Sequence, residues 1–306
     1  MRALPNLRQL RYLVALADHL HFGRAAQACA VTQSTLSAGI HELEALLGIA
    51  VAERTKRSVI LTPVGHRLAE RARLLLRDAE GLMDEAASAG EPMTGQIDLG
   101  VIPTISPFVL PRLVPHVSRA YPRLRLTLRE DKTQSLLDWL AAGRLDLALM
   151  AFPYETEGCE TFMLFEDSYR FACAASHPFA HADKVDIDAM EGESLMLLEK
   201  DQCLHSHALP LFERAPQKAI TSFSATSLHT SVAMVEEGLG TTLLPDLAIT
   251  NGILQGTSVV VRPLAGASNV RRIGLAWRKQ SARADSFRHL GQLMRDWAAA
   301  QVRPAM

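Results

Sequence analysis

The sequence predicts a chain of two parts, an all-α N-terminal part that ends in a long helix and a larger C-terminal α/β part. Three observations predict this division. Apolar residues recur at helical spacing throughout the first part. The segment "GEPMTGQ" at 90–96, with two glycines and a proline, then indicates a hinge. After it, helical stretches alternate with short apolar strands, which predicts a largely parallel, doubly wound sheet.

The composition is typical of a globular protein. The 306 residues are 48% hydrophobic and 21% charged. No apolar run approaches the ~18 residues that cross a membrane, and the N-terminus lacks the apolar core of a signal peptide. The four cysteines, Cys29, Cys159, Cys173 and Cys203, include no CxxC pair. We therefore expect a cytoplasmic protein with reduced thiols, no membrane partner, no metal and no other cofactor.

Positive charge is concentrated at the start of the chain. The whole sequence has a formal net charge of −1, yet its first 77 residues hold eleven Lys and Arg against five Asp and Glu. The remainder is therefore acidic on balance. This asymmetry predicts that the N-terminal part meets an anionic partner, such as double-stranded DNA.

The first helices have the pattern of a helix-turn-helix. The predicted buried face of the first helix holds Leu10, Leu13, Val14, Ala17 and Leu20. A short helix of small residues at 24–29 leads to a tight turn at Ala30 and Val31, and Thr32 is a suitable N-cap for the next helix. Apolar spacing turns four residues of that helix inward: Leu36, Ile40, Leu43 and Leu47.

The opposite face of this last helix is small and polar, as a helix that reads the major groove requires. The residues expected to face the bases are Gln33, Ser34, Thr35, Ser37, Ala38 and His41. A helical hairpin in another all-α domain gives a similar pattern. The basic stretch that follows favours the DNA-binding interpretation. Arg54, Lys56 and Arg57 precede an apolar strand at 59–61, which predicts a wing that holds phosphates.

A long helix is predicted to begin at Pro63. Leu68, Leu75 and Leu82 recur every seven residues, with Ala72 and Ala79 between them. This seam suits pairing with a second chain. The alternative is an amphipathic helix that packs on its own domain.

The C-terminal part places polar residues where ligands bind in α/β folds. Thr104 follows the predicted strand at 97–101, and Thr133 follows the next strand. Ligands lie at the carboxyl ends of such strands. A later helix begins with Thr226, Ser227 and His229; Ser227 is a suitable N-cap, and the helix start suits an anion. A plain capped helix explains the same pattern.

Together these elements resemble the LysR family of bacterial transcriptional regulators. The stretches "FGRAAQACAVTQSTLSAGIHELEALLG" and "ERTKRSVILTPVG" carry the resemblance. It implies a winged helix-turn-helix DNA-binding domain at 1–62, a dimerising linker helix at 63–90 and a sensing domain at 91–306. The sensing domain would be two-lobed and similar to periplasmic binding proteins, with lobe I at about 97–168 and 271–306 and lobe II at about 169–270. The expected partners are an operator, RNA polymerase, and further copies in a homodimer or homotetramer.

Within this family, the stretch "EKDQCLHSHALPLFE" resembles the peroxide sensors. The resemblance makes Cys203 the residue that reacts with hydrogen peroxide. It matches Thr104 and Thr133 to polar residues that line the peroxide pocket. The chain departs from the sensors at Gln202, where they usually have histidine, and at His205, where they often have arginine. The other residues expected in the peroxide or effector pocket are Gln202, His205, Thr226, Ser227 and His229. The sensors carry a second, resolving cysteine nine residues later, where this chain has Phe212. The oxidised form is therefore expected to be a sulfenate, a mixed disulfide, or a disulfide with Cys159 or Cys173.

Other roles for Cys203 stay open. It lines the pocket of a small-molecule inducer in one alternative, and it is a buried inert residue in another. Cys203, His205 and His207 lie close together, but no distant pair of ligands completes a zinc site. An enzyme with Cys203 as nucleophile would leave the DNA-binding pattern unexplained, and the sequence shows no Cys/His/Asp set. We therefore expect a regulator and no enzyme.

Overall fold

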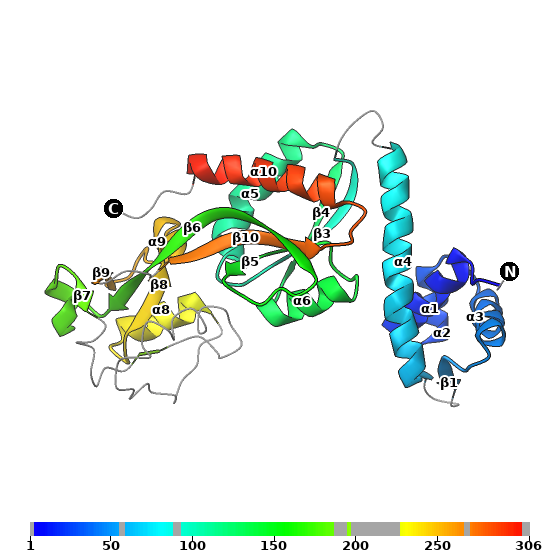
Figure 1. The fold of residues 1–306 in the computed structure, drawn as a ribbon. Helices are drawn as coiled ribbons and strands as arrows, with labels where there is room; N and C mark the ends of the chain where they lie inside the picture. Colours follow the sequence, from blue (N-terminus) through cyan, green and yellow to red (C-terminus); the bar gives the residue numbers. More distant parts are fainter. Residues whose placement is uncertain are drawn as a thin grey trace. The chain divides into compact units, whose positions relative to one another are not determined.

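The computed structural model of the chain describes residues 3–54, 59–87, 93–186, 195–196, 227–265 and 270–301. These residues form two compact units (Figure 1). One unit is built mainly from Met1–Glu91, and the other holds most of the remaining residues.

The N-terminal unit contains the predicted helices and hairpin. Its elements are α1 (Leu7–His19), α2 (Phe22–Ala28), α3 (Gln33–Leu47), β1 (Ala52–Arg54), β2 (Val59–Leu61) and α4 (Pro63–Ala87). Asn6 begins α1 as an N-cap whose side chain accepts from the Gln9 amide. Helices α1, α2 and α3 and part of α4 enclose a core that includes Leu13, Leu16 and Leu36. The predicted buried face of α1 is wrong for Leu20, because this residue leaves the helix in the left-handed conformation and is exposed.

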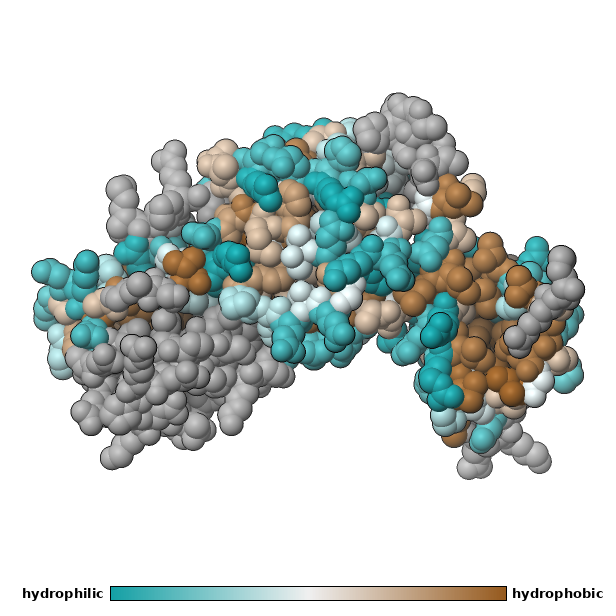
Figure 2. Space-filling view, in the orientation of Figure 1, coloured by the Kyte–Doolittle hydropathy of each residue, from teal (hydrophilic) through white to brown (hydrophobic). Residues whose placement is uncertain are grey.

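The long helix α4 divides the predicted leucine seam in two. Leu68 packs against the core of its own unit, and Ala72 is buried there. Further along the helix, Leu75 and Leu82 are 54% and 66% exposed. Figure 2 shows hydrophobic residues gathered on the visible face of the N-terminal unit. The first half of the seam thus packs within its own chain, and the exposed second half is free to pack against a second chain.

The C-terminal unit is an α/β domain of two lobes. The elements of the first lobe are β3 (Gly95–Val101), α5 (Ser106–Ala120), β4 (Leu124–Glu130), α6 (Thr133–Ala141), β5 (Leu147–Phe152), β10 (Val270–Arg278) and α10 (Ala284–Gln301). The elements of the second are η1 (Pro178–His181), β7 (Val185–Asp186), α8 (Leu228–Glu236), β8 (Thr242–Pro245), α9 (Asp246–Thr250) and β9 (Val260–Ala265). Strand β6 (Cys159–Cys173) is long and runs through both lobes. It pairs with β10, and the two strands lie side by side in Figure 1.

The sheet is mixed, so the prediction of a largely parallel sheet is wrong. Strands β4, β3 and β5 pair in parallel, but β10 is antiparallel to both β5 and β6. The alternation of helices and strands does not reveal this. The reason is that the chain re-enters the first lobe through β10 after building the second, and β10 then runs against its neighbours.

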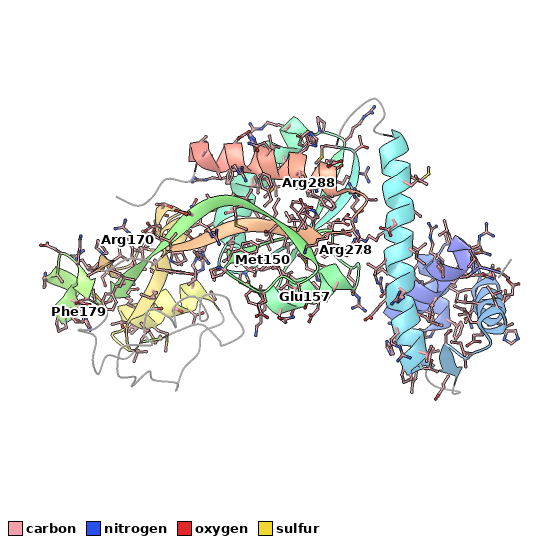
Figure 3. The ribbon with its side chains drawn as sticks, viewed as in Figure 1. Met150, Glu157, Arg170, Phe179, Arg278 and Arg288 are labelled. Atoms are coloured by element: carbon pink, nitrogen blue, oxygen red, sulfur yellow. The ribbon has the colours of Figure 1, made fainter. Side chains whose placement is uncertain are left out.

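Strand β6 changes its partners near its middle. Residues up to Ser168 pair with β10, whereas residues from Tyr169 onward pair with β8 and β9. In Figure 3, Arg170 lies toward the end of β6 and Arg278 lies at the far end of β10. Of the strand predicted at 195–198, Leu195 forms a parallel bridge to Thr241, and residues 197–198 lie outside the described residues.

Candidate nucleic-acid interface and effector site

The turn between α2 and α3 is fixed by backbone geometry. The Val31 amide donates to the Ala26 carbonyl at 3.0 Å, and Ala30 has a φ of 53°. Thr32 then caps α3, because its Oγ1 accepts from the Thr35 amide at 3.2 Å. The prediction of Thr32 as the N-cap is confirmed. These contacts set the angle at which α3 leaves the turn.

Helix α3 has a buried face and an exposed face, as its spacing predicts. Leu36, Ile40 and Leu43 are fully buried, and Leu47 is partly buried. A Cβ added to Gly39 would lie 2.6 Å from the Tyr12 ring, so glycine permits the close approach of α1 to α3. The outer face consists of Gln33, Ser34, Thr35, Ala38 and His41, which are exposed, and Ser37, which is partly buried.

Hydroxyl groups cluster at the start of α3. Thr32 Oγ1 lies 2.9 Å from Ser34 Oγ and 2.8 Å from Thr35 Oγ1. The hydrogen bonds hold these three side chains in place at the end of the helix whose N–H dipoles attract anions. This turn therefore presents ordered donors beside the face predicted to meet DNA.

The hairpin is attached directly to α3. Glu44 Oε1 accepts from the Val51 amide at 2.9 Å, just before β1. Strands β1 and β2 are antiparallel, with Arg54 opposite Val59. The Arg54 side chain, Lys56 and Arg57 lie outside the described residues, so their contact with phosphates stays a prediction.

Two buried threonines lie at one edge of the sheet in the C-terminal unit. Val101 and Glu130 are paired at the ends of the parallel strands β3 and β4, and Thr104 and Thr133 each follow three residues later. Their exposed fractions are 2% and 1%. Among the described residues, Thr133 Oγ1 has no hydrogen-bond partner. A buried hydroxyl of this kind suits a polar ligand.

A buried ion pair, which the sequence pattern does not reveal, holds Thr104 in place. Arg271 Nη1 donates to Thr104 Oγ1 at 2.8 Å, and Nη2 donates to the Thr104 carbonyl at 3.3 Å. The same guanidinium donates to Asp167 Oδ2 through Nε at 3.0 Å and Nη2 at 2.8 Å. Burial raises the pKa of the Asp167 carboxyl against the opposing effect of Arg271. Both strands carry several charged residues, so the sequence pattern alone does not single out this pair.

The start of α8 lies close to α5. The His229 ring stacks on Phe108, with centroids 6.1 Å apart and planes 19° apart. Ser227 Oγ accepts from the His229 amide at 3.2 Å, so its predicted capping role is confirmed. Gln202, Cys203, His205 and Thr226 lie outside the described residues. The structure thus brings His229 to the helix that follows Thr104.

The other cysteines have packed environments. Cys173, which its apolar sequence context predicts to be packed, is fully buried. The polar stretch "YETEGCE" around Cys159 predicts an exposed thiol, which is wrong: Cys159 begins β6 and packs partly against the core. Burial raises the pKa of the Cys159 and Cys29 thiols. Within the described ranges there is no group of three metal-binding side chains. Across those same ranges, every helix is too short or too polar to span a membrane.

Comparison with known proteins gives matches along nearly the whole chain. The model of the "bacterial regulatory helix-turn-helix protein, lysR family" matches residues 7–66, and the "LysR substrate binding domain" matches residues 90–299. A hydrogen peroxide-inducible genes activator from Dickeya chrysanthemi is 38% identical over 95% of both chains. The HTH-type transcriptional regulator EstR from Acinetobacter baylyi is 39% identical over 94% of this chain and 95% of EstR.

The fold also has a close structural counterpart. A full-length OxyR from Pseudomonas aeruginosa, solved with a cysteine replaced by aspartate, superimposes with a TM-score of 0.81. The match covers 96% of this chain and 95% of that one, at 32% identity.

Proposed function

The chain belongs to the LysR family of bacterial transcriptional regulators, and on this premise we propose that it responds to hydrogen peroxide through Cys203. In this proposal it controls oxidative-stress genes. The observation that carries the proposal is the pair of buried hydroxyls at the ends of β3 and β4, in a chain similar over its whole length to a peroxide-inducible activator.

The N-terminal unit binds an operator. The exposed face of α3 enters the major groove, and the basic hairpin lies along the backbone. The exposed leucines of α4 pair two chains, and two dimers form a tetramer. The regulator acts in the cytoplasm, where it contacts RNA polymerase, and it catalyses no reaction.

The sensing step is a single oxidation. The Cys203 thiolate attacks one oxygen of the peroxide, so that an S–O bond forms as the O–O bond breaks. Sulfur loses two electrons to the peroxide, and the leaving hydroxide takes a proton and departs as water. The Thr104 and Thr133 hydroxyls orient the peroxide and stabilise the charge on the departing oxygen.

The oxidised state lacks the usual second thiol. Phe212 stands nine residues after Cys203 and forms no disulfide. We therefore propose that Cys203 stays a sulfenate or forms a mixed disulfide with a small thiol. Disulfides with Cys159 or Cys173 are less suitable, because both of these thiols are packed in the fold.

A second candidate is a regulator that responds to a small-molecule inducer bound between the lobes, with Cys203 lining the pocket. The presence of Phe212, where a peroxide sensor would carry its resolving cysteine, favours it. The stacked Phe108 and His229 rings would then contact the inducer.

The two candidates are separated by titrating the full-length protein with hydrogen peroxide. Mass spectrometry of the Cys203 peptide is combined with DNA footprinting, for the native protein and for Cys203→Ser. The proposal expects oxidation at Cys203 after one equivalent, and a changed footprint that Cys203→Ser abolishes. A Cys203 thiol that survives this treatment, with no change in the footprint, selects the inducer-binding candidate.

A further inference from the structure

We infer that Asp167 is a positioning residue that ties the Thr104 loop to helix α9 of the second lobe. A change at Thr104 is thereby transmitted across the domain. The inference rests on the proposed binding of the effector at Thr104, and it adds the route by which binding reaches the second lobe.

The two oxygens of the Asp167 carboxylate serve different parts of the domain. Oδ2 accepts from Nε and Nη2 of Arg271, which in turn donates to the side chain and the carbonyl of Thr104. Oδ1 accepts from the Leu247 amide at 2.9 Å, in the first turn of α9. One buried carboxylate therefore joins the loop after β3 to a helix of the second lobe.

This carboxylate lies where the two lobes join. Asp167 and Arg271 face each other in the β6–β10 ladder, and Ser168 is the last residue of β6 paired with β10. From Tyr169 onward, β6 pairs with the strands of the second lobe. The tie thus crosses the position at which β6 passes from one lobe to the other.

Because Arg271 and Asp167 are completely buried, their ion pair is either fully formed or fully broken, with no partly solvated state between. The Arg271 and Asp167 side chains are 0% and 1% exposed. Away from water, separating the two charges costs a large free energy. The guanidinium and the carboxylate therefore either both keep their positions or both move. A displaced Thr104 therefore moves Arg271, Asp167 and the α9 amide as one unit, which is what a two-state coupling element requires.

A neighbouring ion pair provides a matched control. Arg170 Nε donates to Asp246 Oδ1 at 2.6 Å, and this pair also fastens the start of α9 to β6. Arg170 is on the second-lobe side of the change in pairing, and its described contacts do not include Thr104. Asp246→Asn therefore loosens α9 without cutting the proposed route.

The first test needs no effector. Hydrogen exchange of peptides covering α9 is measured in the full-length protein and in Thr104→Val, which removes the hydroxyl acceptor and keeps both buried charges. We expect exchange to accelerate by about fivefold or more, the lower end of the range for coupled sites. In an Asp167→Asn background, Thr104→Val should add no further change. In an Asp246→Asn background, its effect should persist.

The second test adds one equivalent of hydrogen peroxide. In the native protein, oxidation should change both α9 exchange and operator affinity. In Asp167→Asn, Cys203 should still be oxidised, while the ratio of operator affinities between oxidised and reduced protein shrinks by about fivefold or more. Asp167→Glu, which keeps the charge, should recover part of that ratio. A merely structural role would lower stability without separating oxidation from response.

Two results overturn the inference. One is α9 exchange that is indifferent to Thr104→Val, a result that stands even if Asp167→Asn does not fold. The other is an Asp167→Asn protein with the full response. An unoxidised native Cys203 together with a clear Thr104 effect on α9 would instead refute the peroxide proposal and leave the tie in place.

Discussion

Single residues in this chain acquire their chemistry from burial. A free thiol has a pKa of ~8.5 and is the nucleophile only when deprotonated. Burial raises the pKa of Cys29 and Cys159, so less thiolate is present at neutral pH. Nearby arginines oppose this effect without cancelling it. These two cysteines should therefore be poor targets for peroxide.

The thiol environments give a prediction on pH. Alkylation of Cys29 and Cys159 by iodoacetamide should rise by close to tenfold between pH 7 and 8 and show no plateau there, because burial raises both pKa values above the usual ~8.5. Peptide mass spectrometry at a series of pH values measures each rate. Cys203, if it is the sensor, should react much faster at pH 7 and level off earlier. A plateau below pH 8 for Cys159 would contradict its burial.

Sequence reasoning succeeds for residues whose role is local. Thr32 and Ser227 were predicted as N-caps, since a cap needs only its own first turn. Asp167 and Arg271 were not predicted, because their importance comes from a meeting of residues 104 positions apart. Periodicity predicts which side chains are buried, but it does not tell which buried charges are paired.

At the scale of elements, the recognition helix depends on its first turn. Thr32→Ala removes the acceptor of the Thr35 amide and the hydroxyl that holds Ser34. We expect the free energy of unfolding of the N-terminal unit to fall by about 1 kcal/mol, and operator affinity to fall as well. Urea denaturation and fluorescence anisotropy measure the two effects. Thr32→Ser, which keeps the hydroxyl, is the control and should retain most of both.

The long helix shows what a heptad pattern leaves undecided. Periodicity predicted the seam, but it did not show that Leu68 packs against the core of its own unit while Leu75 and Leu82 are exposed. That division depends on where the rest of the N-terminal unit ends against the helix. The exposed half is the part that the proposed dimer would bury.

A substitution on this exposed half tests the dimer. A leucine buried at an interface contributes about 2 kcal/mol, so Leu75→Glu with Leu82→Glu should raise the dimer Kd at least about a hundredfold. Light scattering across a dilution series measures it. Leu239→Glu, at a leucine 57% exposed in the C-terminal unit, is the matched control and should leave assembly unchanged. A native protein that is already monomeric would refute the pairing.

At the scale of the whole molecule, the sequence predicted the order of the parts and the chemistry of their partners, but not the direction of the strands. The alternation of helices and strands is the same whether a returning strand runs parallel or antiparallel, so the sheet was predicted to be largely parallel, whereas β10 runs antiparallel to β5. The charge asymmetry needs no such geometry. An excess of positive charge in the first 77 residues, in a chain of net charge −1, concentrates DNA attraction at one end.

Contacts to phosphates and contacts to bases should respond differently to mutation and to salt. Arg57→Ala should weaken binding to operator and random DNA alike, and lower the slope of log K against log salt by about 1, because one phosphate contact is lost. His41→Ala, on the exposed face of α3, should weaken operator binding by about 1–3 kcal/mol and leave the salt slope and random-DNA binding nearly unchanged. Anisotropy titrations at several salt concentrations, with both DNAs, measure all four quantities. Each variant is the control for the other. An unchanged salt slope in Arg57→Ala would contradict the contact between the wing and the phosphates. Equal losses of affinity for both DNAs in His41→Ala would contradict the contact between α3 and the bases.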